Sequence, residues 1–399
     1  MRPWLLVVAA VGLALPAVAQ ARTFEVSLLD GRVLLATAIR GDPAGELELQ
    51  VGGVATRLAG AGVLAVQGCA MQPLDLPSAW LVGGEVCTGL LAGGDATGDH
   101  VDLLSPSLGR LVLPVDRLQA LLVTPNVRLE SMPLPNGVGE ALFQRAAIGY
   151  DVLAGSLHQF SERGVRFQPA GDAAPRWFRP QDLVGLRIAD GVARAKPAAV
   201  WLATRTGDRL GVDVQRFTGD GVQCGLENGG TALVRYGDLA SLSFLGRATF
   251  LSDLQPKEVV EGGFDGDVVH PWQRDRSAVG GALVAGERTH GKGLGVHSRS
   301  RLVFVVPAGH ASFWTRVALD DTAAALPFRA QADVRVLVND QLRFEHKGLE
   351  AGQPPRDAGR LPVAPGDRVA LEVDFGKGRD LGDRVDWLTP VFLRGGKEQ

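Results

Sequence analysis

Hydrophobic and polar residues alternate over short stretches along most of this chain, which is the period of half-buried β-strands. In residues 368–375 every second side chain is apolar, and residues 301–306 and 333–338 also alternate. Turns rich in Gly and Pro separate these stretches. The pattern predicts an all-β protein in which residues 249–394 form an antiparallel β-sandwich.

Residues 22–247 carry one apolar pattern four times. Each copy ends in a nine-residue segment with apolar residues at its first, sixth and ninth positions. The sixth positions are Val63, Leu118, Leu183 and Leu239, which are separated by 55, 65 and 56 residues. Turns of the Asp-Gly and Gly-Asp type lie between apolar runs, as in β-hairpins. We expect about four or five short strands per copy, curled into a small barrel similar to the Sm or SH3 type, and blades of a propeller are the alternative.

A segment with several prolines and glycines, residues 124–140, divides these copies and is predicted to be a linker. The predicted organisation is therefore two β repeats in residues 22–123, the linker, and two further β repeats in residues 141–247. The composition then changes, because five of the seven histidines lie beyond residue 249. This change marks the start of the predicted sandwich, residues 249–394.

The first 21 residues have the features of a signal peptide. Arg2 precedes an apolar stretch, residues 5–15, that is too short to span a bilayer, and small residues suited to signal-peptidase cleavage follow at 17–21. No later stretch is long and apolar enough to predict a transmembrane segment. We expect an exported protein that is periplasmic, located at the cell surface, or extracellular.

Composition narrows the classes of function. The 52 glycines among 399 residues favour many tight turns. A net charge of −3 without a run of Lys or Arg argues against nucleic-acid binding. Three cysteines do not make a disulfide framework, and no Cys/His spacing is typical of zinc. Cys69 and Cys87 either pair across adjacent strands or remain buried thiols.

Five motifs follow one another in the last part of the chain. They are residues 250–254 (FLSDL), 291–300 (GKGLGVHSRS), 313–321 (FWTRVALDD), 334–340 (VRVLVND) and 383–387 (DRVDW). Their order and spacing resemble NPCBM, a family of carbohydrate-binding modules with a galactose-binding-like, jelly-roll sandwich fold. The resemblance covers residues 249–394 and implies a shallow glycan site. Because sandwiches of this kind often hold one structural calcium, it also implies a calcium site.

Polar and aromatic residues near the predicted loops of the sandwich form the candidate site. Trp272 lies in a polar loop and is expected to expose a ring on which a sugar can stack, whereas Trp314 and Trp387 alternate with strand residues and are expected in the core. The expected ligand-binding residues are Trp272, His297, Asp320, Asp321 and Asp386. Carboxylates on loops suit calcium. The expected metal ligands are Asp320, Asp321 and Asp383.

No catalytic residue is expected. Lys292 is followed by Gly293 instead of the Ser or Thr of a phosphate-binding loop, and no nucleophile elbow is present in the sequence. Nothing fixes the aspartates at the separation that a glycosidase needs. We therefore expect an exported, non-catalytic protein that binds a glycan or cell-surface polysaccharide. A cell-envelope scaffold with a protein partner is the alternative, and a glycoside hydrolase is a third interpretation.

Overall fold

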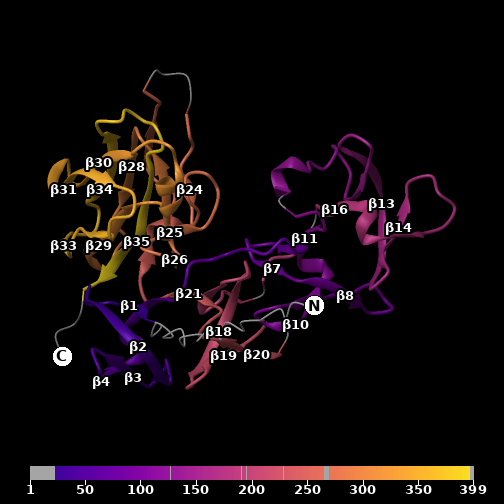
Figure 1. The fold of residues 1–399 in the computed structure, drawn as a ribbon, viewed down its shortest axis with the longest axis horizontal. Coiled ribbons are helices and arrows are strands. Elements are labelled where there is room, and N and C mark those ends of the chain that lie inside the picture. The colour runs from indigo at the N-terminus through magenta and orange to yellow at the C-terminus, as the bar shows by residue number, and fades with distance from the viewer. Residues whose placement is uncertain are drawn as a thin grey trace, which may run out of the picture.

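The computed structural model describes residues 23–125, 127–189, 191–194, 196–227, 229–264 and 269–395, and the predicted signal peptide, residues 1–21, lies outside the described residues. The described residues form antiparallel strands joined by tight turns and short 3-10 helices. The protein is therefore all-β, as its hydrophobic pattern predicts. None of the helices among these residues has the length and apolar character needed to cross a membrane. In Figure 1 the C-terminal strands, orange to yellow, form a body at the upper left, and the earlier strands lie below it and to its right.

The first repeat is a sheet that curls back on itself. Its strands are β1 (Phe24–Leu28), β2 (Val33–Gly41), β3 (Glu46–Val51), β4 (Val54–Ala59) and β5 (Val63–Gln67). A 3-10 turn at Gly60–Gly62 connects β4 to β5. Because β1 pairs antiparallel with both β2 and β5, the first and last strands of the repeat lie side by side.

The pairing of a first strand with a closing strand recurs three times between residues 78 and 244. The strands of the second repeat are β6 (Ser78–Leu81), β7 (Val86–Thr88), β8 (Leu90–Gly94), β9 (His100–Ser105), β10 (Gly109–Pro114) and β11 (Leu118–Leu122). Those of the third are β12 (Glu140–Arg145), β13 (Tyr150–Ser161), β14 (Gly164–Pro169), β15 (Arg176–Phe178) and β16 (Leu183–Ile188). Those of the fourth are β17 (Val200–Thr204), β18 (Arg209–Phe217), β19 (Gly221–Gly225), β20 (Thr231–Arg235) and β21 (Leu239–Phe244). In each repeat the first strand again pairs with the closing strand: β6 with β11, β12 with β16, and β17 with β21.

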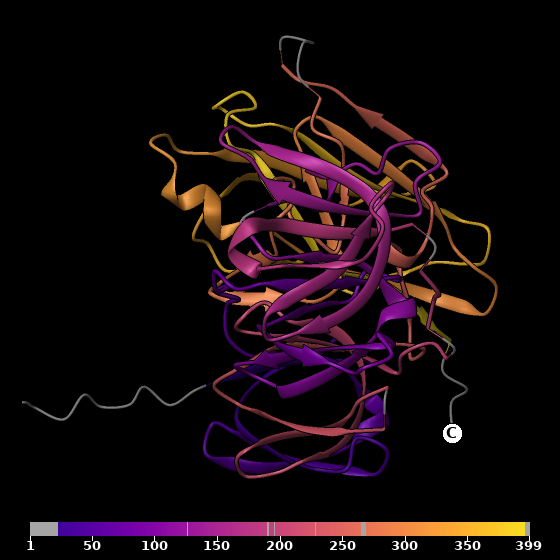
Figure 2. The same cartoon turned by 90° about the vertical axis from the view of Figure 1, so that its right-hand side faces the viewer.

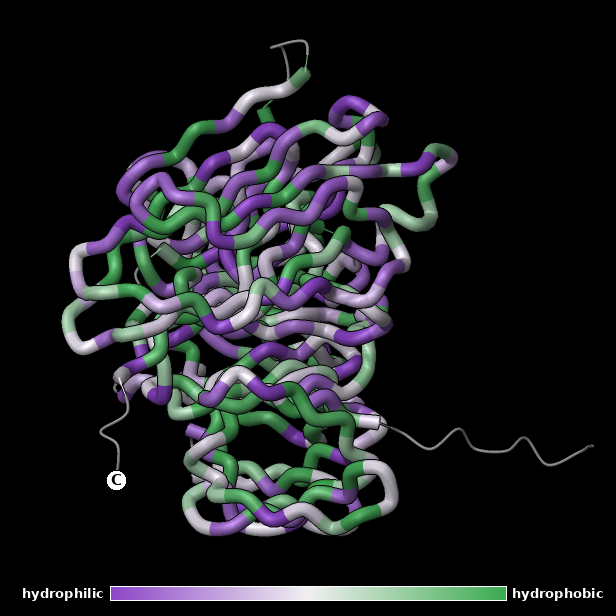
Figure 3. Tube along the Cα trace, turned by 90° about the vertical axis from the view of Figure 1, so that its left-hand side faces the viewer, coloured by the Kyte–Doolittle hydropathy of each residue, from purple (hydrophilic) through white to green (hydrophobic). Residues whose placement is uncertain are grey.

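The apolar anchors of the sequence pattern position the closing strands. Val63, Leu118, Leu183 and Leu239 are the first residues of β5, β11, β16 and β21, and each is fully buried. A buried residue at a defined position fixes which face of a strand points to the core, because successive side chains alternate between the two faces. Figure 3 shows hydrophilic and hydrophobic residues following one another along much of the described chain.

The closing strands also join the repeats to one another. β5 of repeat one pairs with β21 of repeat four, with Val66 opposite Leu242. β11 of repeat two pairs with β16 of repeat three, with Leu121 opposite Leu186. The strand pairing therefore joins the outer two repeats and the inner two repeats, rather than the two repeats on each side of residues 124–140. Figure 2 shows strands of repeats one and four, indigo and rose, together at the bottom of the molecule.

Two antiparallel sheets make up the C-terminal sandwich. One contains β22 (Thr249–Phe250), β24 (Gln273–Arg274), β27 (Gly293–His297), β29 (His310–Leu319), β32 (Arg356–Asp357), β33 (Leu361–Pro362) and β35 (Arg384–Arg394). The other contains β23 (Glu258–Glu261), β28 (Ser300–Val305), β30 (Gln331–Val338), β31 (Gln341–Glu350) and β34 (Arg368–Phe375). Their apolar faces form one core that includes Phe304, Val334 and the fully buried Trp387. A separate hairpin, β25 (Leu283–Ala285) and β26 (Arg288–His290), packs on β29 and β35 through Leu283 and Ala285.

A small apolar core joins the sandwich to repeat one. Leu64 of β5 packs with Phe250 of β22, Trp314 of β29 and Val391 of β35. Trp314 is 1% exposed, and its indole N–H donates a hydrogen bond of 3.0 Å to the Asp357 carboxylate. Trp314 is therefore a core residue, as expected, but it belongs to the core between the sandwich and the first repeat.

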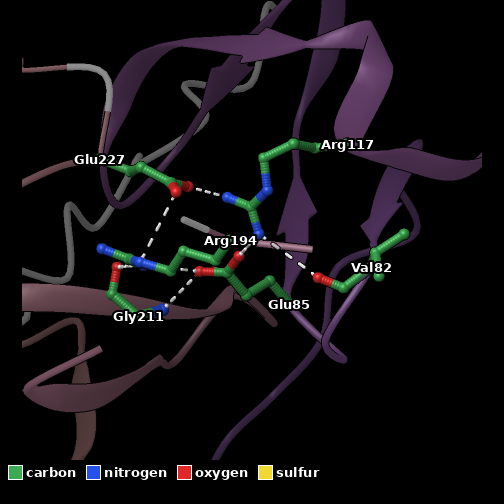
Figure 4. Close-up of polar contacts among 6 residues, drawn as sticks. All are labelled: Val82, Glu85, Arg117, Arg194, Gly211 and Glu227. Carbon is green, nitrogen blue, oxygen red and sulfur yellow. Dashed lines mark hydrogen bonds and ion pairs between the residues drawn. The ribbon is translucent and has the colours of Figure 1, made fainter. Parts of the chain in front are cut away.

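A buried network of ion pairs joins repeat two to repeat four (Figure 4). The carboxylate of Glu85 accepts hydrogen bonds from Arg117, from Arg194 at 3.1 Å and from the backbone N–H of Gly211 at 2.8 Å. Glu227 forms ion pairs with the same two arginines. Two carboxylates therefore balance two guanidinium groups, which offsets the cost of removing these charges from water.

The cysteine side chains contribute to packing and hydrogen bonding within the repeats. Cys87 and Cys224 are free and buried, and burial raises the pKa of both thiols, that of Cys224 to about 12. The thiol of Cys69 donates to the carbonyl oxygen of Leu239 at 3.3 Å. The thiols of Cys87 and Cys224 are therefore both protonated at neutral pH, and each behaves as a small apolar side chain.

Candidate functional site

Three neighbouring strands bring most of the candidate residues to one end of a sheet. His297 is the last residue of β27 and pairs with Arg384 of β35. Asp320 follows β29, and its backbone N–H donates to the carbonyl oxygen of Arg384 at 2.8 Å. Asp386 lies two residues further along β35, opposite Ala318 of β29. His297, Asp320 and Asp386 therefore share one end of the β27–β35–β29 sheet.

Asp320 and Asp386 are neighbouring carboxyl groups that are both fully buried. Asp320 accepts hydrogen bonds from the backbone N–H of Thr322 at 2.9 Å and of Val284 at 3.2 Å. Burial, followed by the negative charge of Asp320, raises the pKa of Asp386 well above its usual range. The raised pKa favours the protonated form of Asp386, which allows the two carboxyl groups to lie side by side.

Asp321 bonds the tip of the hairpin that covers this end of the sheet. Its carboxylate accepts hydrogen bonds from the backbone N–H groups of Gly286 at 3.2 Å and Glu287 at 2.8 Å. Together with the bond from Val284 to Asp320, these contacts fix β25 and β26 over β29 and β35. The consecutive aspartates of the DD motif thus hold a hairpin in place.

Asp383 belongs to a different network from Asp320 and Asp321. It is fully buried and accepts hydrogen bonds from the Ser298 hydroxyl at 2.6 Å and from the backbone N–H of Gln331 at 3.2 Å. Burial raises the pKa of Asp383 to about 7. The structure thus does not bring the three expected calcium ligands together. Among the residues that the structure describes, no group of three or more His, Cys, Asp or Glu side chains is placed to hold a metal ion.

His297 is half-buried and lies against a second histidine. Its ring centroid is 4.4 Å from that of His270, with an angle of 37° between the ring planes. Its Nδ1 lies 3.0 Å from the carbonyl oxygen of Ser298. Burial lowers the pKa of His297, and the neighbouring His270 acts in the same direction. The His297 ring is therefore neutral at pH 7 and presents hydrogen-bonding nitrogens without a charge.

Trp272 is half-buried and not the fully exposed platform that its loop position suggests. Its side chain packs against the sandwich core, and the guanidinium of Arg274 lies 5.1 Å from its ring centroid. Its backbone N–H donates to the Glu261 carboxylate at 2.5 Å. Trp272 stands two residues from His270, so it lies near the histidine pair and can contribute only part of its ring to a ligand.

Lys292 has a structural role. Its side chain is 2% exposed, and its Nζ lies 2.5 Å from a carboxylate oxygen of Asp253 and 2.9 Å from one of Asp275. Asp275 also pairs with Arg209 of repeat four at 3.2 Å. The glycine-rich motif therefore fixes the sandwich to the repeats, which agrees with the absence of a phosphate-loop signature in the sequence.

A cleft of about 760 Å³ lies between the sandwich and the repeats. The sandwich contributes parts of residues 270–291 to its wall, repeat two contributes Trp80 and Val86, and repeat four contributes Arg209. Arg128 and Glu130, after repeat two, also line it. His270 lines the cleft, so the His270–His297 pair connects it to the candidate residues.

Sequence reasoning missed this cleft. Trp80, Arg128, Arg209 and Arg276 come from four separate segments of the chain, and no motif or spacing links them. Only the packing of the repeats against the sandwich brings these side chains together. In sequence, the arginine and tryptophan residues of a repeat are not distinguishable from ordinary surface residues.

The C-terminal part of the chain matches a known protein family. Residues 247–393 match the family model of the NPCBM/NEW2 domain. This match begins where the composition of the chain changes and includes all five motifs. No curated protein matches the chain.

Similar solved structures contain CBM51 modules. CBM51 from Clostridium perfringens GH95, in complex with methyl-galactose, is 20% identical with a TM-score of 0.32, and the match covers 36% of this chain and 99% of that chain. The CBM51-2 and INT domains of Clostridium perfringens ZmpB, in complex with GlcNAc, are 19% identical with a TM-score of 0.32, covering 58% and 43%. The tandem CBM51 modules of Sp3GH98 from Streptococcus pneumoniae SP3-BS71 are 12% identical with a TM-score of 0.33, covering 80% and 88%. These scores are low over the whole chain, so the family assignment rests on the domain model. The C-terminal part of this chain, residues 247–393, is an NPCBM/NEW2 domain, as the order of its motifs predicts.

Proposed function

We propose that this protein binds carbohydrate through its NPCBM/NEW2 domain and that it is exported and non-catalytic. The observation that carries the proposal is the match of residues 247–393 to a family of carbohydrate-binding modules. The histidine pair supports it, because the imidazole nitrogens of His270 and His297 can bond sugar hydroxyls. Trp272 and Arg274 beside them supply an aromatic edge and a charged donor.

The positions of the aspartates support a binding role rather than hydrolysis. A glycosidase needs two carboxyl groups that flank the scissile bond and reach the substrate. Asp320 and Asp386 are fully buried beneath the hairpin, and Asp321 bonds the hairpin backbone. Asp320 and Asp321 are engaged in holding the hairpin in place, and Asp386 is shielded from a substrate by burial.

Calorimetry and a glycan array with the full chain test the proposal. Methyl galactoside and N-acetylglucosamine are suitable first probes, because these sugars occur in complexes of CBM51 modules. We expect His297→Ala and Trp272→Ala to weaken binding of the sugar that the array identifies by about tenfold or more, since each removes a contact worth on the order of 1–2 kcal/mol. Trp177→Ala is the matched control, because Trp177 is 38% exposed on repeat three. A folded protein that binds no glycan on the array refutes the proposal.

The repeats support a second candidate function, a cell-envelope scaffold that holds a protein partner. The turn between β12 and β13 exposes Ile148 by 95%, and Val152 in the following strand, four residues further along, is 40% exposed. Exposed apolar residues that cluster on one element are typical of interaction surfaces. We expect Ile148→Ser to reduce association of the full chain with isolated cell envelopes and Val54→Ser, on repeat one, to leave it unchanged. Equal association of both variants and the parent chain argues against this role.

A further inference from the structure

Positive charge exceeds negative charge beside the cleft between the sandwich and the repeats. Asp275 pairs with both Lys292 and Arg209, and Asp253 pairs with Lys292. Arg276 is close enough that its charge, after the larger effect of burial, contributes to lowering the pKa of Arg209. Three cations therefore share two carboxylates, and the other charged residues of the cleft lining, Arg128 and Glu130, cancel each other, so one positive charge is left over.

Arg276 is the cation that is left over. In the described part of the chain no carboxylate forms an ion pair with it, and its guanidinium lies 5.3 Å from the ring centroid of Trp80. The side chain is half-buried and lines the cleft. Contact with an aromatic face holds a guanidinium in place while its N–H groups stay free to donate. Arg276 therefore offers a fixed, unused set of donors to a ligand in the cleft.

The ligand that fits these donors carries a planar anion and many hydroxyl groups. A guanidinium donates two parallel hydrogen bonds to a carboxylate. Gln273, His270 and Glu130 line the same cleft and supply donors and acceptors for hydroxyl groups. The cleft volume of about 760 Å³ lies within the range of small-ligand sites, about 300–1,000 Å³. A uronic acid unit of a polysaccharide combines these properties.

We infer that the cleft binds an acidic oligosaccharide, a chain that contains uronic acid units, and that a sugar carboxylate bonds to Arg276. The inference rests on the proposed function, since it names the class of carbohydrate and places it at the junction of the two parts. It also gives the repeats a role, because Trp80 and Arg209 come from them. A neutral sugar leaves Arg276 without a counter-charge, so the site discriminates between acidic and neutral chains.

Calorimetry of the full chain with trigalacturonate and with neutral galactotriose of the same linkage tests this inference. The two trisaccharides differ in carrying a carboxylate or a hydroxymethyl group at each C5. We expect trigalacturonate to bind about tenfold or more tightly, because a hydrogen bond to a charged group is stronger than one to a neutral group. Its affinity falls as salt rises from low to physiological concentration, since the partly exposed charges are screened.

Substitutions at Arg276 and Val279 test whether the acidic ligand binds in the cleft. We expect Arg276→Gln to remove the preference for trigalacturonate over galactotriose, whereas Arg57→Gln keeps it, because Arg57 is 67% exposed on repeat one and lies outside the cleft lining. Val279→Glu provides a second variant that leaves Arg276 in place. Val279 lines the cleft and is 40% exposed, so a carboxylate there repels the acidic ligand without disturbing the core. Melting temperatures show whether each variant is folded.

Equal binding of the two trisaccharides, or an unchanged preference in both folded variants, overturns the inference. Carbohydrate binding as such then still stands if a neutral glycan binds and His297→Ala weakens it. An empty glycan array and no heat with either trisaccharide overturn the inference and the proposed function together.

Discussion

Glu25 of β1 and Arg316 of β29 form a buried ion pair although 291 positions separate them in the sequence. Their side chains are 9% and 11% exposed. The pair joins the first strand of the first repeat to the middle of the NPCBM/NEW2 domain. The two parts of the chain are therefore fixed to each other by charge as well as by the apolar core around Trp314.

Loss of one member of this pair is expected to destabilise the protein strongly. Glu25→Ala leaves the Arg316 guanidinium buried without a counter-charge, and the free energy of unfolding falls by about 3–5 kcal/mol. Urea denaturation measures the change. Asp30→Ala is the control, because Asp30 pairs with Arg32 at the surface and such pairs contribute about 0–1 kcal/mol. Similar losses in both variants contradict the role of the buried pair.

The stability of the sandwich is expected to depend on pH through Asp383. Its pKa is about 7 in the folded state and near 3.8 in the unfolded state, so the unfolded chain releases this proton first as pH rises. The contribution of Asp383 is complete below pH 3.8 and is lost as pH rises towards 7. Asp383→Asn removes this dependence. The difference in unfolding free energy between the Asn variant and the parent chain should grow with pH from about 4 to about 7, by a few kcal/mol, and then level off.

The comparison of Asp383→Asn with the parent chain separates the effect of Asp383 from that of His290, which has the opposite pH dependence. Burial lowers the pKa of His290 to about 4, so the stability due to a neutral His290 is present above pH 6.5 and is lost as pH falls towards 4. His290 is the same in both proteins, and its effect cancels in the difference. A difference that is constant between pH 4 and pH 8 argues against a raised pKa at Asp383.

The absence of a side chain at Gly295 is expected to be necessary for the position of the cleft wall around Arg276. A Cβ at this position would lie 2.3 Å from the backbone oxygen of Arg276 and 2.5 Å from the backbone carbon of Ser277. Gly295→Ala therefore displaces the segment that carries Arg276, lowers stability by about 1–3 kcal/mol and weakens ligand binding in the cleft. At Gly262 a Cβ would have no neighbour within 4 Å. We expect Gly262→Ala to change stability by less than about 0.5 kcal/mol, and an equal response of the two variants in thermal unfolding refutes the steric role.

The effect of calcium on stability tests whether Asp320, Asp321 and Asp383 form a metal site. Asp320 and Asp321 accept backbone N–H groups, and Asp383 accepts the Ser298 hydroxyl in a separate network. Because these oxygens do not converge, we expect the same melting temperature in excess calcium and in excess EGTA. Specific calcium binding to the folded state raises the melting temperature. A rise that disappears in Asp320→Asn restores the calcium site predicted from the sequence.

Much of the fold is predictable from local patterns, because alternation records which face of a strand is buried. Residues 368–375 become β34, and the four apolar anchors begin the closing strands. The motif order predicts the NPCBM/NEW2 domain. The roles of single side chains are less predictable, since a carboxylate on a loop looks the same in sequence whether it binds a ligand or a backbone. Asp321 bonds the hairpin at Gly286, and only the fold places that hairpin within reach.

The pairing of β5 with β21 has a consequence for how the chain acquires its structure. Residue 66 meets residue 242 across these strands, so the first repeat keeps an open strand edge until most of the chain has been synthesised. Contacts of such large sequence separation slow folding and leave intermediates prone to aggregation. The repeats are thus not independent modules that can be truncated from one end. A fragment that stops before residue 239 lacks the strand that covers β5, and a chaperone that shields this edge is expected to improve the yield of native protein.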